Sequence, residues 1–401
     1  MTLLLLTYFF PPCGAVAAYR ALGFAHHLPK SGWNVVVVAP PGVAGEPHDP
    51  GLLKKVPATT KVIRVPFSQS ILTRALRRWL LYEVWLPSAW RVIKKVLEIN
   101  SLSVVLTTGP PPAVHLLGWL VKRKCGLPWF ACFRDPLISQ QCYRPSIINW
   151  IQTRVEALTL READRIIVNT PNSLADLRAS YPQYAEKMTM LTNGLDPLPQ
   201  PPRGQLTLPI HRSLNLLFAG EIYRDRDPRN LLEALKELGE RRPGRDPPFR
   251  MTFLGRDTEG LLEAALVANP ALGQFLTIKG HVPFEEARQA MLAADILCVL
   301  QGPGYQPYIP AKIYEYLVVG KPIFALAERG SDVEWVLRTS GVTHQIAESN
   351  NRAKIMDALM ELSREITEGR ARPPDADKIK VFTRESLARE LARHLDAYCK
   401  F

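Results

Sequence analysis

Lys312 and Glu315 stand three residues apart in GPGYQPYIPAKIYEYLVVGKPIFAL, residues 302–326. This spacing puts both side chains on one face of a helix, which Pro310 would open and Gly320 would cap. A carboxylate at the start of such a helix can hold the two hydroxyls of a ribose, as acidic residues do in nucleotide sites. The alternative is a surface ion pair worth only a few tenths of a kcal/mol. The apolar residues on both sides of Glu315 favour the binding site.

A second candidate loop lies in LNLLFAGEIYRDRDPRNLLEAL, residues 214–235. An apolar strand is expected to end at Gly220, and a helix to begin near Pro228. Arg224 and Arg226 stand between them. Guanidinium groups beside a helix N-terminus match a diphosphate in geometry and charge. The alternative is a solvated charged loop.

Two further loops in the first half of the chain contain residues that could bind a substrate. Arg134 and Asp135 follow the apolar run WFACF and should share a sheet edge with Gly109, which also ends a strand. Such a pair can orient a sugar hydroxyl and a phosphate, or it can simply shape a loop. Gly14 precedes a helix, where a small residue lets a phosphate approach the free N–H groups. An ordinary strand-to-helix turn is the alternative there.

The elements around these loops alternate between short apolar runs and stretches of helical period along the whole chain. TLLLLTYF, NVVVVAP and LNLLFAG are examples of the runs. This alternation is typical of parallel sheets covered by helices on both faces. It predicts two doubly wound α/β domains, at residues 1–197 and 213–380. A Pro-rich linker at 198–212 separates them, and a terminal helix occupies 381–401, with Thr383 as its N-cap.

The amino-acid composition excludes several classes of protein. The chain has 401 residues, 47% hydrophobic and 22% charged, which excludes disordered and collagen-like proteins. The apolar run at the N-terminus is too short to span a bilayer and lacks the features of a signal peptide. Six cysteines without a CxxC pair predict reduced thiols, and therefore a cytoplasmic protein.

Positive charge is concentrated in the first half of the chain. Residues 1–200 contain 22 Lys and Arg against 11 Asp and Glu, while the whole chain has a net charge of +12. Residues 71–97 are basic and Trp-rich, as in helices that lie on an anionic membrane. The alternative is a pair of domain helices with a solvated basic face. No RRM, KH or zinc-finger pattern is present, so nucleic acid is not an expected partner. The residues expected at the acceptor or membrane are Arg77, Arg78, Trp79, Trp85, Trp90, Lys94 and Lys95.

Taken in chain order, the four loops resemble those of the retaining glycosyltransferases of family 4, which have the GT-B fold. The resemblance runs over nearly the whole chain, and its most specific pieces are YFFPPCGAVAAYR, ADRIIVNTPNSLADL and IPAKIYEYLVVGKPI. The subset with a Phe-Arg-Asp-Pro stretch is the most similar. The resemblance implies two Rossmann-like domains facing a cleft, with the terminal helix crossing back to the first. It also implies a donor site in the second domain, an acceptor site in the first and no metal.

The resemblance also assigns roles to residues. Glu315 would bind the donor ribose, and Arg226, helped by Arg224, the diphosphate. Pro307 stands where the family has its first glutamate, so backbone amides at 304–306 would replace that contact. Arg134 and Asp135 stand where many members have a histidine. The residues expected to bind the donor are Gly14, Gly220, Arg224, Gly255, Val282, Gly304, Tyr305, Gln306, Ile313 and Glu315; those expected in catalysis are Arg226, Lys312, Asp135 and Arg134.

The function expected from this resemblance is sugar transfer from a UDP- or GDP-linked donor, without a further cofactor. The acceptor would be a lipid-linked or envelope glycan, and the protein would be peripheral on the inner face of the cell membrane. Arg226 and Lys312 would stabilise the leaving diphosphate. Two alternatives remain open. One is a sugar-nucleotide 2-epimerase of the same fold, and the other is a non-catalytic subunit that binds sugar nucleotides.

Overall fold

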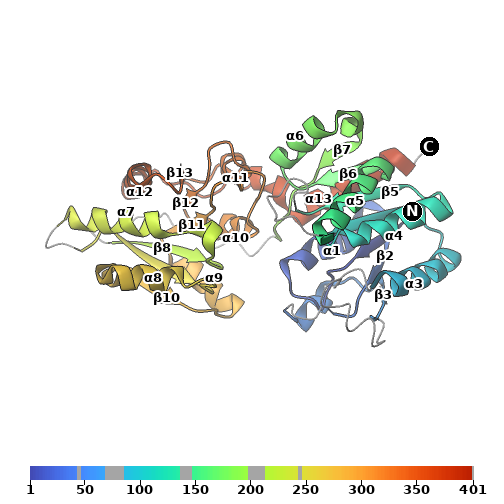
Figure 1. Cartoon of the computed structure of the whole chain (residues 1–401), viewed down its shortest axis with the longest axis horizontal. Coiled ribbons are helices and arrows are strands. Elements are labelled where there is room, and N and C mark those ends of the chain that lie inside the picture. Colours follow the sequence, from blue (N-terminus) through green and yellow to red (C-terminus); the bar gives the residue numbers. More distant parts are fainter. Residues whose placement is uncertain (43–46, 68–84, 136–146, 197–212, 243–245, 400–401) are drawn as a thin grey trace. The chain divides into compact units, whose positions relative to one another are not determined.

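A computed structural model describes residues 1–42, 47–67, 85–135, 147–196, 213–242 and 246–399 (Figure 1). The chain forms two compact units. Unit 1 comprises Met1–Asp196 and Phe382–Phe401, and unit 2 comprises Pro197–Val381. The predicted linker at 198–212 lies outside the described residues. No helix in the described ranges combines the length and the apolar character needed to cross a bilayer.

Unit 1 contains a parallel sheet of seven strands in the order β3-β2-β1-β4-β5-β6-β7. The chain order therefore reverses between β1 and β4, which are neighbours in the sheet. Such a switch point is where open α/β sheets bind their ligands. The strands are β1 (Thr2–Thr7), β2 (Asn34–Ala39), β3 (Lys61–Arg64), β4 (Val104–Gly109), β5 (Trp129–Phe133), β6 (Arg165–Val168) and β7 (Met188–Met190).

Helices cover both faces of this sheet, which explains why its central strands are apolar along most of their length. Leu4 and Leu6 of β1 belong to a buried cluster with residues of α3, α4, α5 and α6. Leu3 and Leu5 belong to a second cluster with α1 and α13. A strand buried on both sides needs apolar residues at every position. The helices are α1 (Val16–His27), α3 (Leu86–Ile99), α4 (Ala113–Cys125), α5 (Ile147–Glu162), α6 (Pro171–Ser180) and α13 (Arg384–Cys399).

The terminal helix α13 packs on unit 1 beside α1, as predicted (Figure 1). It begins after Thr383, whose Oγ1 accepts a hydrogen bond from the Ser386 N–H at 3.2 Å, so the predicted N-cap is confirmed. Leu387, Leu391 and Leu395 of this helix are buried in the core of unit 1.

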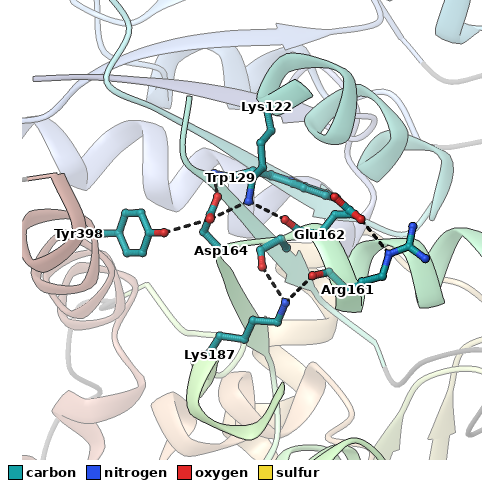
Figure 2. Close-up of polar contacts among 8 residues, drawn as sticks. Lys122, Trp129, Arg161, Glu162, Asp164, Lys187 and Tyr398 are labelled. Atoms are coloured by element: carbon teal, nitrogen blue, oxygen red, sulfur yellow. Dashed lines mark hydrogen bonds and ion pairs between the residues drawn. The ribbon is translucent and has the colours of Figure 1, made fainter. Parts of the chain in front are cut away.

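Asp164 ties the end of α13 to the sheet (Figure 2). Its carboxylate accepts hydrogen bonds from Lys122 Nζ at 2.7 Å, the Trp129 N–H at 2.8 Å and the Tyr398 hydroxyl at 3.0 Å. These donors come from α4, β5 and α13. One carboxylate at the start of β6 therefore fastens three other elements of unit 1.

Unit 2 repeats the plan with a parallel sheet of six strands in the order β10-β9-β8-β11-β12-β13. The switch point here lies between β8 and β11. The strands are β8 (Leu214–Ala219), β9 (Phe249–Leu254), β10 (Leu276–Lys279), β11 (Ile296–Leu300), β12 (Ile323–Leu326) and β13 (His344–Ala347). The helices are α7 (Arg229–Glu240), α8 (Leu261–Ala268), α9 (Phe284–Ala293), α10 (Lys312–Val319), α11 (Asp332–Ser340) and α12 (Arg352–Thr367).

Candidate functional site

The first candidate site lies at the carboxyl edge of the sheet in unit 2, where β8 and β11 are adjacent. The loop after β8 contains Arg226, and the loop after β11 leads into α10, whose first turn contains Lys312 and Glu315. These are the two segments that the sequence singled out in the second half of the chain. The switch point thus brings them to one edge.

Gly220 and Gly255 permit a close approach of backbone at this edge. Gly255 follows β9 with φ of +133°, and a β-carbon there would collide with the carbonyl oxygen of Gly220. The N–H of Gly220 donates to the Leu254 carbonyl at 2.7 Å. The glycine at 255 is therefore needed to bring the loops after β8 and β9 together. The loop after β8 thus begins with Gly220, a residue without a side chain.

Arg226 is half-buried in the loop after β8. Its Nη1 donates to the carbonyl oxygen of Glu221 at 3.2 Å, and its guanidinium lies 4.8 Å from the ring centre of Tyr223. Arg224, in the same short 3₁₀ turn, has a side chain that is 87% exposed and lies 3.7 Å from a Glu259 carboxylate oxygen. Of the two predicted arginines, only Arg226 is oriented by contacts within its own loop.

Lys312 and Glu315 occupy the first turn of α10, which ends at Gly320 with φ of +78°, as predicted. Burial lowers the pKa of Lys312 from its ordinary value, and the nearby charge of Arg226 lowers it too, while Glu315 opposes the shift. A partly desolvated lysine beside an arginine forms a cationic pair, which attracts a doubly charged diphosphate. Lys312 and Glu315 are both half-buried, so neither is a fully solvated surface group.

Tyr316 was missed by the sequence analysis as a site residue. Its side chain is buried, and its hydroxyl oxygen accepts a hydrogen bond from the Ala219 N–H at 3.1 Å. This contact joins α10 to the last residue of β8. The apolar neighbours of Tyr316 in sequence indicated a core position, but nothing in the pattern indicated its hydrogen bond.

The remaining residues expected at the donor have different surroundings. Ile313 is buried in the core under α10, so its side chain supports the helix and cannot contact a ligand directly. Val282 lies past the end of β10, the edge strand of the sheet. Gly304, Tyr305 and Gln306 lie in the loop after β11, close to the switch point.

In unit 1, Arg134 and Asp135 lie directly after β5. Arg134 Nη2 lies 2.9 Å from Asp135 Oδ2, and the Arg134 N–H donates to the Gly109 carbonyl at 3.0 Å. The guanidinium also lies 5.8 Å from the ring centre of Phe9, in the loop after β1. The predicted pair is thus formed, at the edge shared by β1, β4 and β5.

His115 lies under this edge in the core. Its Nδ1 is 2.8 Å from Thr107 Oγ1, and its ring centre is 4.6 Å from that of Phe133. Burial lowers the pKa of His115 to about 3, so the ring stays neutral near pH 7. A β-carbon on Gly109 would come within 2.9 Å of His115 Nε2, which explains the glycine at that position.

Gly14 does not present a free amide to a phosphate. Its N–H donates to the Pro47 carbonyl at 2.7 Å. Residues 47–49 also lie against Gly14, because a β-carbon on it would lie 3.2 Å from Cβ of Asp49. A phosphate could use this amide only if residues 47–49 moved away. The expectation that a phosphate passes Gly14 to reach the first N–H groups of α1 stays a prediction.

The basic segment 71–97 is described only from Trp85 onward; Arg77, Arg78 and Trp79 lie outside the described residues. Trp85 is fully buried and donates to the Val65 carbonyl at 2.9 Å, so its expected contact with a membrane is wrong. Trp90 packs partly against the core. Lys94 and Lys95 are exposed on α3, beside a groove of about 650 Å³ whose lining also includes Val65, Phe67 and Arg91.

Within the described ranges, no three His, Cys, Asp or Glu side chains are grouped so that they could hold a metal ion.

The chain is similar to known proteins in sequence and in structure. Residues 17–194 match the family model of a glycosyl transferase 4-like domain. The matching residues lie within unit 1. No curated protein matches the chain.

Solved structures resemble the whole chain. Sucrose-phosphate synthase from Thermosynechococcus elongatus is 20% identical, with a TM-score of 0.66 over 99% of this chain and 100% of that one. HepE from Anabaena, solved with UDP-glucose, is 14% identical, with a TM-score of 0.63 over 99% and 100%. The lipopolysaccharide outer core galactosyltransferase WaaB is 13% identical, with a TM-score of 0.59 over 97% and 100%. The chain thus has the predicted GT-B fold.

Proposed function

We propose that this protein is a retaining hexosyltransferase that takes its sugar from a nucleotide-sugar donor without a metal ion. The observation that carries the proposal is the arrangement of Arg226, Lys312 and Glu315 at the switch point of the sheet in unit 2. Two cations and a carboxylate at this edge suit the diphosphate and the ribose of such a donor. The UDP-glucose bound by the structurally similar HepE supports this choice of ligand.

Each residue at this edge has a distinct part in the proposed reaction. Glu315 accepts hydrogen bonds from the ribose hydroxyls and so positions the nucleotide. Arg226 and Lys312 contact the diphosphate, and they stabilise the charge that develops on it when the bond to the sugar breaks. The acceptor hydroxyl attacks from the face that the diphosphate leaves, and a phosphate oxygen takes its proton. Arg134 and Asp135 of unit 1 orient the acceptor.

The proposed acceptor is a lipid-linked or envelope glycan at the cytoplasmic face of the membrane, which makes the protein peripheral. Exposed cations on adjacent helices of unit 1 support this part. They include Lys94 and Lys95 on α3 and Arg123 on α4. Arg123 lies 5.7 Å from the ring centre of Trp119, and cations next to tryptophan suit the interface of an anionic bilayer. The similarity to WaaB agrees with an envelope glycan.

A binding and turnover experiment tests the proposal. UDP, GDP and their hexose derivatives are titrated into the full chain by calorimetry, and nucleotide release is then followed with and without glycan acceptors. Slow release of the nucleoside diphosphate without acceptor is the result expected of a transferase. Interconversion of two donors without any acceptor would instead indicate a 2-epimerase. Tight binding without turnover would indicate a binding subunit, and no binding at all would overturn the proposal.

A further inference from the structure

Glu328 lies in the loop after β12, next to the loop that follows β11. The two strands are parallel neighbours, with Leu300 paired to Leu326, so both loops leave the same edge of the sheet. Glu328 Oε2 accepts a hydrogen bond from the Gly304 N–H at 3.1 Å. The carboxylate is therefore held over the glycine-containing loop, beside the edge that holds Lys312.

Further hydrogen bonds hold these two loops together. The Gln301 N–H donates to the Leu326 carbonyl at 2.9 Å, and the Asp332 N–H donates to the Gln306 carbonyl at 2.9 Å. The position of Glu328 thus follows from main-chain contacts on both sides of it. A side chain held in this way loses little further freedom when it binds a ligand.

The carboxylate of Glu328 keeps most of its capacity to accept hydrogen bonds. Among the described residues, no Lys, Arg or His nitrogen forms an ion pair with it, and the Gly304 N–H is its one hydrogen-bond donor. A carboxylate offers about four acceptor positions on its two oxygens. Glu328 is half-buried, and the Gly304 N–H fills one of these positions.

The surroundings of this carboxylate are those of a carbohydrate site. Gly304 has φ of +83°, and a β-carbon built on it would meet no atom within 4 Å, so the outer side of the loop is open. The rings of Tyr305 and Tyr308 lie on the same loop with centres 5.1 Å apart. A sugar ring offers hydroxyl donors at its edge and C–H groups on its faces. A carboxylate and aromatic rings complement these two features.

We propose that Glu328, with Gly304 and Tyr305, forms the subsite for the sugar ring of the donor, and that its carboxylate accepts hydrogen bonds from the sugar hydroxyls. This rests on the proposed function, because a nucleotide on Glu315 with its diphosphate on Arg226 and Lys312 places the sugar beyond the diphosphate. Glu328 then decides which hexose is accepted, since it contacts hydroxyls whose configuration differs between sugars.

The test measures dissociation constants by calorimetry for UDP, UDP-glucose, GDP and GDP-mannose, using the full chain. The tightest pair found with wild type is then used for the variants. Glu328→Ala removes the carboxylate, and Glu328→Gln removes its charge while keeping an oxygen that can accept from the Gly304 N–H. Glu348→Gln is the matched control, because Glu348 follows the next strand, β13, at the same edge.

Hydrogen bonds to charged groups are strong enough that losing them costs about tenfold or more in affinity. We expect the dissociation constant of the sugar nucleotide to rise at least tenfold in Glu328→Ala, and by less in Glu328→Gln. The constant for the nucleoside diphosphate should change less than twofold in both. Glu348→Gln should alter neither.

Deoxy donors give a second measurement. If Glu328 contacts a hydroxyl, the deoxy donor that lacks this hydroxyl should bind wild type about tenfold more weakly than the complete donor does. In Glu328→Ala the two donors should bind equally well, because the contact is already lost. Equal losses for diphosphate and sugar nucleotide in Glu328→Ala would overturn the inference and leave Glu328 as a loop brace. Wild type that binds none of the four nucleotides would instead overturn the proposed function.

Discussion

The hydroxyl of Tyr316 and the main-chain N–H of Ala219 are joined by a buried hydrogen bond of 3.1 Å between α10 and the end of β8. Lys312 and Glu315 belong to the same helix as Tyr316, and Gly220 is the residue after Ala219. The bond therefore sets the distance between the two segments that we expect to hold the donor nucleotide.

Tyr316→Phe should lower the stability of unit 2, because the buried Ala219 N–H loses its acceptor. Such a loss costs about 1–3 kcal/mol. Urea unfolding followed by circular dichroism measures the change. Nucleotide affinity should fall as well, since α10 is no longer held to β8. A variant with unchanged stability and unchanged affinity would show that the bond has no role in the site.

Glu315→Gln should weaken nucleotide binding while leaving the fold intact. An amide accepts hydrogen bonds from ribose hydroxyls less strongly than a carboxylate does, so we expect a loss of about tenfold or more. Calorimetry with the nucleoside diphosphate gives the affinity, and thermal unfolding checks the fold. A variant that binds as tightly as wild type would exclude Glu315 from the site.

Arg226→Ala should reduce affinity for the diphosphate much more than affinity for the corresponding nucleoside. Arg224→Ala is the matched control, because its side chain is 87% exposed in the same turn and is expected to matter less. The comparison uses nucleoside and nucleoside diphosphate with both variants. Equal losses of affinity for the two ligands in Arg226→Ala would point to a folding defect. Equal losses of diphosphate affinity in the two variants would show that the net positive charge of the loop matters, and not a contact of Arg226.

Lys312 should make diphosphate binding depend on pH below the range where an ordinary lysine titrates. Burial lowers the pKa of this lysine, so its ammonium group loses the proton earlier as the pH rises. Affinity for the diphosphate should accordingly fall with rising pH, and binding should be accompanied by proton uptake. Calorimetry in buffers of different ionisation enthalpy measures both. In Lys312→Arg the fall should disappear, because arginine stays charged.

Unit 1 should bind anionic vesicles at low salt, release them at high salt and ignore neutral vesicles. Each lysine or arginine near such a surface contributes about 1 kcal/mol, and the attraction fades within a Debye length. Replacing Arg77, Arg78, Lys94 and Lys95 by Glu should abolish sedimentation with the vesicles. The control is Arg389→Glu with Arg393→Glu on α13, where both arginines are exposed on the helical layer opposite α3. Wild type that ignores anionic vesicles at low salt would favour a soluble acceptor.

Most strands could be predicted from the sequence, and the inner strands most clearly, because they are apolar and buried on both faces. Two could not. β7 (Met188–Met190) and β13 (His344–Ala347) are short edge strands, and three of the four residues of β13 are only half-buried. Such strands need fewer apolar residues and leave a weak pattern.

Some residues of the candidate site could likewise be predicted from the sequence, and others could not. Lys312 and Glu315 are visible in sequence because they stand at helical spacing in one segment. Tyr316 and Glu328 are not, since their roles depend on contacts with Ala219 and Gly304, in other loops and strands. Trp85 was misplaced for a related reason. A tryptophan among cations has the same appearance whether its ring faces a lipid or, as here, the core.

The place of α13 in unit 1 has a consequence for synthesis on the ribosome. Leu387, Leu391 and Leu395 complete the core next to Phe24 and Leu28, yet they are translated after all of unit 2. At about 5–20 residues per second, the intervening residues take roughly 10–40 s to make. During that time the nascent first unit has an apolar face uncovered and is exposed to aggregation, while unit 2, which is continuous in sequence, completes its own core. Helix α13 therefore completes the core of unit 1 only after the whole of unit 2 has been made.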